Sequence, residues 1–159
     1  MKETQRSRRI GGSIGALLIG IFAGAILSFG TDELLHIAGM FPALGQPMND
    51  ALLLIATAHR TVYNVVGSYI VARLAPNRPI QHAMASGVVS LVLGTGGTLA
   101  TWNRGLASHW YPLAIIALAI PCAWAGGRLR VMQLRARVDG EGPRKNRFQN
   151  KNIRRLAND

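Results

Sequence analysis

One stretch of the sequence sets polar and charged side chains inside an otherwise apolar run. Between residues 51 and 72 the only full charge is Arg60, and His59 precedes it. At the three- and four-residue steps of a helix, one side of this run carries the polar stripe Thr57, Arg60, Thr61, Asn64 and Ser68. His59 and Tyr63, four residues apart, occupy the adjacent side and could touch. Such groups could bind an anion or relay a proton.

Arg60 needs a partner, because arginine keeps its charge at any depth of a bilayer. Its guanidinium could reach an acid of the outer side and lock the outer loop to the bundle. Those acids are Asp32, Glu33 and Asp50. It could instead bind backbone carbonyls near residues 94–97 or beside Pro121, or hold an anionic ligand or lipid headgroup. We expect His59 to be a hydrogen-bonded interior histidine, with a proton relay as the alternative.

The elements that must position these side chains are apolar runs. About 20 apolar residues let a helix cross a hydrocarbon core of roughly 30 Å. The expected transmembrane domain, residues 10–127, has spans of about 10–29, 51–72, 83–102 and 110–127. Lys and Arg outnumber Asp and Glu by 18 to 7 and gather outside these runs, as they do when a bilayer excludes charge. The predicted fold is therefore an all-α integral membrane bundle of four transmembrane helices.

Basic residues in short connections predict the orientation. Residues 1–9, 73–82 and 128–159 are basic, whereas residues 30–50 contain no Lys or Arg. The connection after the third run holds only Arg104. This alternation places both termini in the cytoplasm, and we expect a multi-pass membrane protein.

The first run and the connection after it leave alternatives open. The basic start, apolar run and small residues near position 30 also fit a cleavable signal peptide, which would leave three spans. In the 30–50 connection, apolar residues fall on one helical face over residues 32–41, before Pro42. A short helix on the outer membrane surface and a less ordered loop both fit that pattern.

Small residues predict where helices pack in lipid, because they let backbones approach closely. In the first run they recur every fourth residue, and the third run has a similar pair. The expected packing residues are Gly12, Ala16, Gly20, Gly24, Ser28, Ser90 and Gly94. These seams could lie inside one bundle, in a homo-oligomer or against another membrane protein.

The C-terminal segment 128–159 holds ten Lys and Arg and three acids. A basic cluster next to a membrane attracts anionic lipid by about 1 kcal/mol per residue. The headgroup candidates nearest the membrane are Arg128, Arg130, Arg135 and Arg137. Gly140, Gly142 and Pro143 predict the end of a helical extension, with a disordered remainder. Nucleic acid is not the expected partner, because the chain has no nucleic-acid-binding module.

Several segments of the last three runs carry a family resemblance: residues 59–64, 67–69, 72–76, 78–79, 109–112 and 121–127. Over roughly residues 45–130, the chain resembles a family of small bacterial inner-membrane proteins that has no established activity. The resemblance implies only the fold and a location in the bacterial inner membrane.

The expected function is that of a non-enzymatic accessory, assembly or regulatory membrane subunit. No catalytic residue, metal-ligand cluster or cofactor motif stands out in the sequence. The alternative is a small oligomeric transporter or channel that uses the polar stripe around Arg60. A membrane enzyme using His59, Arg60 and Tyr63 on a lipid is a third hypothesis, disfavoured because such enzymes bring carboxylates or paired histidines to the membrane surface.

Overall fold

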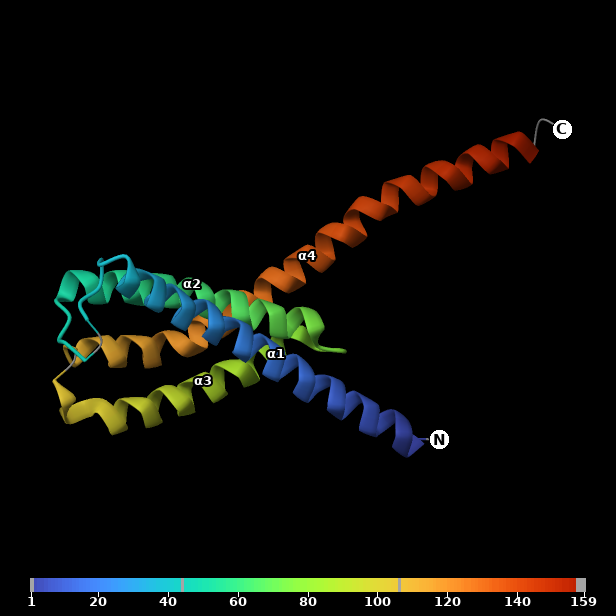
Figure 1. Cartoon of the computed structure of the whole chain (residues 1–159). Helices are drawn as coiled ribbons and strands as arrows, with labels where there is room; N and C mark the ends of the chain where they lie inside the picture. Colours follow the sequence, from blue (N-terminus) through green and yellow to red (C-terminus); the bar gives the residue numbers. More distant parts are fainter. Residues whose placement is uncertain (1, 44, 106, 157–159) are drawn as a thin grey trace.

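The computed structural model describes the backbone of residues 2–43, 45–105 and 107–156, and side chains within residues 11–139 of these ranges. The described backbone is all-helical. Its elements are α1 (Lys2–Ile37), α2 (Asp50–Leu74), α3 (Pro79–Thr101), the short 3-10 helix η1 (Trp102–Arg104) and α4 (Trp110–Leu156). Figure 1 shows the helices side by side, with α1 and α4 extending beyond the bundle.

The helices alternate in direction along the bundle. The α1–α2 and α3–α4 connections lie at one end, and the α2–α3 connection lies at the other, where both termini leave the bundle (Figure 1). α2 packs against α1 and α4, and α4 also packs against α3. α1 and α3 make a smaller contact with each other. α2 packs against α3 as well.

Three of the helices are long and apolar enough to cross a membrane. They cover Gly11–Ile37, Pro79–Arg104 and Trp110–Asp139. α2 has the length, with 25 residues, but it carries His59 and Arg60 in its middle and charges at both ends. The polar stripe that makes α2 a candidate for chemistry is thus also what lowers its hydropathy.

α1 continues eight residues past the predicted end of the first span. The sequence predicted either a short surface helix over residues 32–41 or a less ordered loop. Residues 32–37 are helical, but they form the last turns of α1 and not a separate helix. α1 ends at Ile37, and Gly39, whose φ is 70°, caps it. The amide of Met40 donates to Leu35 O and that of Gly39 to His36 O, as in a Schellman motif. Asp32 is consequently a helical residue.

α4 continues through the residues that were expected to end it. The sequence predicted a break at Gly140, Gly142 and Pro143, but the helix runs to Leu156. Proline removes one helical hydrogen bond and costs about 3 kcal/mol, yet Arg, Lys, Gln and Glu on either side are strong helix formers. The backbone therefore keeps its helical path away from the bundle (Figure 1).

Small residues bring the helices together, as the spacing predicted, but not along the whole ridge. Ala16 and Gly20 of α1 are buried, and Gly20 and Gly24 face Gly67 of α2. Gly12 has open space around it. On the other side of α2, Gly126 of α4 fits against Val65, Ser68 and Tyr69. The half of the bundle nearer the α2–α3 connection is therefore closely packed through glycine.

Candidate functional site

The four helices surround a cavity with a volume of about 450 Å³. Such a volume is typical of a small-molecule site. The apolar part of its lining includes Phe29, Leu93 and Ile115. Its polar lining residues are Ser28, Arg60, Tyr63, Asn64, Ser68, Ser86, Ser90, Thr98, Thr101 and Tyr111. The cavity thus combines one cation with hydroxyl groups and apolar walls.

Arg60 both lines the cavity and forms an ion pair. Its Nη2 donates a hydrogen bond to Asp32 Oδ2 of α1. The guanidinium carbon also lies 5.9 Å from the ring centre of Phe29 and 5.9 Å from that of Tyr111. Of the three alternatives for the partner of Arg60, the structure shows the carboxylate. The carboxylate belongs to helix α1, however, so the contact ties α1 to α2 rather than a loop to the bundle.

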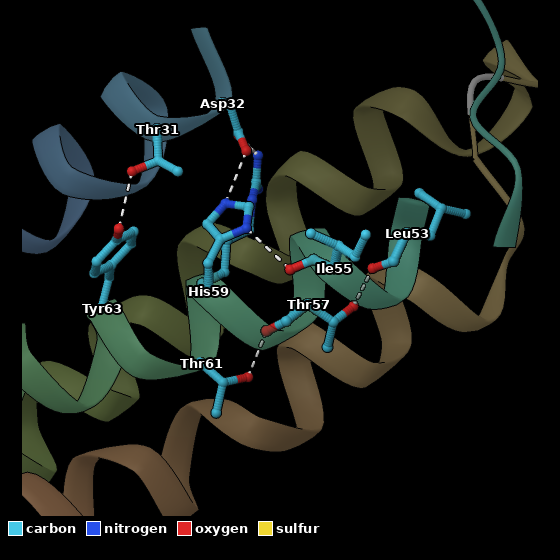
Figure 2. A network of polar contacts seen from close by, with 9 residues as sticks. Thr31, Asp32, Leu53, Ile55, Thr57, His59, Thr61 and Tyr63 are labelled. Atoms are coloured by element: carbon cyan, nitrogen blue, oxygen red, sulfur yellow. Dashed lines mark hydrogen bonds and ion pairs between the residues drawn. The ribbon is translucent and has the colours of Figure 1, made fainter. Parts of the chain in front are cut away.

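His59 shares the same carboxylate. Its Nε2 lies 2.9 Å from Asp32 Oδ1, and its Nδ1 lies 3.0 Å from the carbonyl oxygen of Ile55 (Figure 2). The predicted contact with Tyr63 is present, with ring centres 5.8 Å apart in an edge-to-face arrangement. Thr31 of α1 donates to the hydroxyl oxygen of Tyr63 at 3.0 Å. Two neighbouring residues of α1, Thr31 and Asp32, thus hold three residues of α2.

The predicted polar stripe of α2 divides into two parts. The hydroxyls of Thr57 and Thr61 donate to carbonyls one turn earlier on α2, those of Leu53 and Thr57 (Figure 2). Such internal bonds satisfy a hydroxyl inside a helix, and neither threonine lines the cavity. Asn64 and Ser68 do line it, together with Arg60.

The third helix supplies the opposite wall of the cavity. Ser90 and Gly94, predicted as packing residues, both line the cavity, and only an ordinary contact with Ile116 would meet a side chain at Gly94. Ser86 is buried and donates to Ala83 O, and its hydroxyl also lies 3.4 Å from that of Ser68. Ser28 of the α1 ridge lines the cavity as well. Small polar residues thus create the cavity rather than close it.

Sequence reasoning missed the role of Tyr111. Its side chain lines the cavity beside Arg60. The residue before it, Trp110, donates from its indole nitrogen to Asp50 at 2.9 Å, and Ser108 donates to the same oxygen at 2.6 Å. These two hydrogen bonds, first that of Ser108, lower the pKa of Asp50. This clasp fixes the start of α4 against the start of α2.

Among the residues that the structure describes, no three His, Cys, Asp or Glu side chains gather as metal ligands would. No protein family, no curated protein and no solved structure matches the chain. The resemblance of residues 45–130 to small bacterial inner-membrane proteins therefore stays a prediction. The functional argument rests on the cavity and on the three residues Asp32, His59 and Arg60.

Proposed function

We propose that the chain is a four-span protein of the bacterial inner membrane that binds a small polar ligand in its cavity without converting it. The observation that carries this proposal is that Arg60, Tyr63, Asn64 and Ser68, polar residues of an intramembrane helix, line one cavity. Polar groups inside a membrane protein are costly and tend to mark a binding site or pathway. The role is that of a non-enzymatic membrane subunit that recognises a ligand.

A spanning α2 accounts for the distribution of its side chains. Leu54, Ile55 and Val62 are exposed apolar residues suited to lipid, whereas Arg60 meets a carboxylate and the cavity. With α2 as a fourth span, both termini and the α2–α3 connection share one side. The positive-inside rule makes that side the cytoplasm, since residues 1–9, 73–82 and 128–159 are basic.

Packing at the inner end of the cavity favours a binding site over an open pore. The lining extends from Thr101 and Tyr111, near the α3–α4 connection, to Ser68 and Ser86. There the two serines lie 3.4 Å apart, and Gly20 packs directly on Gly67. A transporter would have to separate these contacts in each cycle. Transport of the bound ligand is therefore the alternative function, and binding alone is the one favoured.

Filling the cavity tests the binding function. Ser90→Leu adds a large apolar side chain to the lining, whereas Val88→Leu places a leucine on the exposed side of the same helix. Purified variants in nanodiscs would be titrated with butyrate, benzoate and inorganic phosphate by isothermal calorimetry. We expect wild type and Val88→Leu to bind at least one probe alike and Ser90→Leu to lose it. Equal binding by Ser90→Leu, or no binding by any variant, would overturn the proposal.

Flux separates binding from transport. Liposomes containing wild type or Arg60→Ala would be loaded with the anion that binds best, and its release measured. Release by wild type that Arg60→Ala abolishes would establish the transporter alternative. Release at background level for both, together with measured binding, would leave the accessory ligand-binding subunit.

The basic end of α4 would hold anionic lipid. Arg128 stacks over the ring of Trp124 at 5.0 Å, and Trp124 is half exposed, as suits the membrane boundary. Arg135 and Arg137 follow as exposed residues. Replacing both by Gln should weaken retention of phosphatidylglycerol in detergent extracts, whereas replacing the outer-side Arg104 by Gln should not. Equal retention by both variants would contradict this role.

A further inference from the structure

His59 faces a hydrogen-bond acceptor at each of its ring nitrogens. Nε2 lies 2.9 Å from Asp32 Oδ1, and Nδ1 lies 3.0 Å from the carbonyl oxygen of Ile55 (Figure 2). A neutral imidazole carries a single N–H, so it can donate to only one of them. Both contacts are hydrogen bonds only when the His59–Asp32 pair holds one proton more than a neutral ring and a carboxylate.

A His59–Asp32 pair that holds this extra proton has, together with Arg60, one net positive charge. Asp32 also accepts from Arg60, which is always charged, and it is the only carboxylate that forms an ion pair among the described residues. The other groups facing this cluster are phenols: Tyr63 packs on His59, and Tyr111 of α4 lies beside Arg60. The cavity-lining residues of α3 are Ser, Thr, Gly and Leu.

An uncompensated cation within a membrane span is costly, and the cavity offers a place for its counter-ion. Arg60 lines the cavity, and its Nε is buried without a hydrogen-bond partner. A guanidinium presents a planar fork of donors that matches the two oxygens of a carboxylate or phosphate. Phe29, Leu93 and Ile115 supply apolar wall for the remainder of such a molecule.

We propose that the cavity binds an organic oxyanion, a carboxylate or a phosphate ester, and that each anion enters together with one proton held by His59 and Asp32. This inference rests on the proposed ligand-binding function. Because coupling between two ligands is reciprocal, the bound anion favours the proton, and acidification favours the anion. Where the free site has lost its proton, affinity rises about tenfold for each pH unit of acidification.

Calorimetry in two buffers of different ionisation enthalpy counts the protons taken up with a probe. The protein would be studied in phosphatidylcholine nanodiscs, with butyrate and inorganic phosphate as soluble probes. In the lipid arm, phosphatidylglycerol would be added to the nanodiscs, and its displacement of butyrate measured. Displacement by the lipid indicates a headgroup as the natural ligand, and competition by phosphate alone indicates a soluble anion. Each result supports the proposal, provided that about one proton enters per anion.

Two histidine variants give the matched control. His59→Gln keeps a donor toward Asp32 but cannot take the extra proton, so its residual binding should not change with pH. His82→Gln removes a histidine that contacts Ser13 and does not line the cavity, so proton uptake should remain as in wild type. Nitrogen NMR of labelled histidine gives a second readout. The His59 signal, identified by its loss in His59→Gln, should move to the doubly protonated position when butyrate is added.

The outcomes separate this inference from the function on which it rests. If neither soluble nor lipid anion binds wild type at any pH, the inference and the ligand-binding function both fail. If an anion binds without proton uptake, or if the uptake persists in His59→Gln, the ligand-binding function stands and the proton coupling is wrong. Unfolding curves that match wild type for His59→Gln and His82→Gln would show that both variants retain the fold.

Discussion

Gly67 of α2 lies in direct backbone contact with Gly20 of α1. A methyl group on Gly67 would come within 2.8 Å of the carbonyl oxygen of Gly20, closer than real Cβ atoms approach. On Gly20, a methyl group would overlap Val71 and lie 2.7 Å from the carbonyl oxygen of Gly67. The two helices therefore meet where neither has room for a side chain. This contact sets the position of α1, from which Asp32 reaches His59 and Arg60.

Gly67→Ala should destabilise the bundle by about 1 to 3 kcal/mol, because the added methyl group meets backbone that cannot move cheaply. Unfolding in mixtures of mild detergent and dodecyl sulfate would measure the loss. Gly15→Ala is the matched control, since nothing lies within 4 Å of its added Cβ. That change should be neutral or stabilise the helix by up to about 1 kcal/mol. Equal stability of the two variants would show that the glycine contact is wrong.

The ridge of small residues shows how far spacing alone can predict packing. The four-residue repeat identified which residues share a face of α1, and Ala16, Gly20 and Gly24 do face the bundle. Spacing cannot tell where along that face the partner helix lies, so Gly12, in the same register, has open space around it. Similarly, Ser90 and Gly94 have packing-type spacing but line a cavity. Whether a row of small residues is packed against another helix or faces open space depends on how the helices are placed relative to each other.

The need for a partner at Arg60 could be predicted from charge, but its identity could not. Asp32 was one of three acids on the outer side, and the prediction placed it beyond the helix. Its position depends on α1 continuing to the cap at Gly39, which the apolar pattern does not encode. Likewise, Thr57 and Asn64 share a stripe in sequence, but hydrogen bonding within the helix takes up the threonine hydroxyl.

Removing Asp32 should cost more than removing Asp32 and Arg60 together. Asp32→Leu leaves the Arg60 cation without its carboxylate. Loss of one partner of a fully buried pair costs about 3 kcal/mol, which is the upper bound for this partly buried pair. Arg60→Met combined with Asp32→Leu removes the stranded charge, so much of that stability should return. Glu33→Leu, at the exposed neighbouring residue, should change little. Arg60→Met alone completes the comparison. If the loss of stability in the double variant equals the sum of the losses in the two single variants, Asp32 and Arg60 are not coupled.

Cysteine labelling tests whether α2 spans the membrane. In a Cys122→Ala background, a single cysteine would replace exposed Gln46 in the α1–α2 connection or exposed Asn77 in the α2–α3 connection. If α2 is the fourth span, an impermeant maleimide should label position 46 in spheroplasts and position 77 only after lysis. Arg137→Cys should behave like position 77, because both lie on the predicted cytoplasmic side. Labelling of positions 46 and 77 from the same side would rule out a spanning α2.

The clasp at Asp50 should weaken in acid. Hydrogen bonds from Ser108 and Trp110 hold the pKa of this carboxyl below its ordinary value of 3.8. Because the folded pKa is the lower one, the clasp contributes its full stability above pH 3.8, and that contribution disappears as pH falls through the folded pKa. Unfolding of wild type and Asp50→Ala would be compared from pH 6 to pH 3, about the range over which a carboxyl titrates. Wild type should lose its advantage over Asp50→Ala toward the acid end.

Ser108→Ala combined with Trp110→Phe keeps the carboxylate but removes both donors, so it should follow Asp50→Ala. A wild-type advantage that does not change with pH would mean that the charge of Asp50 plays no part in holding α2 against α4.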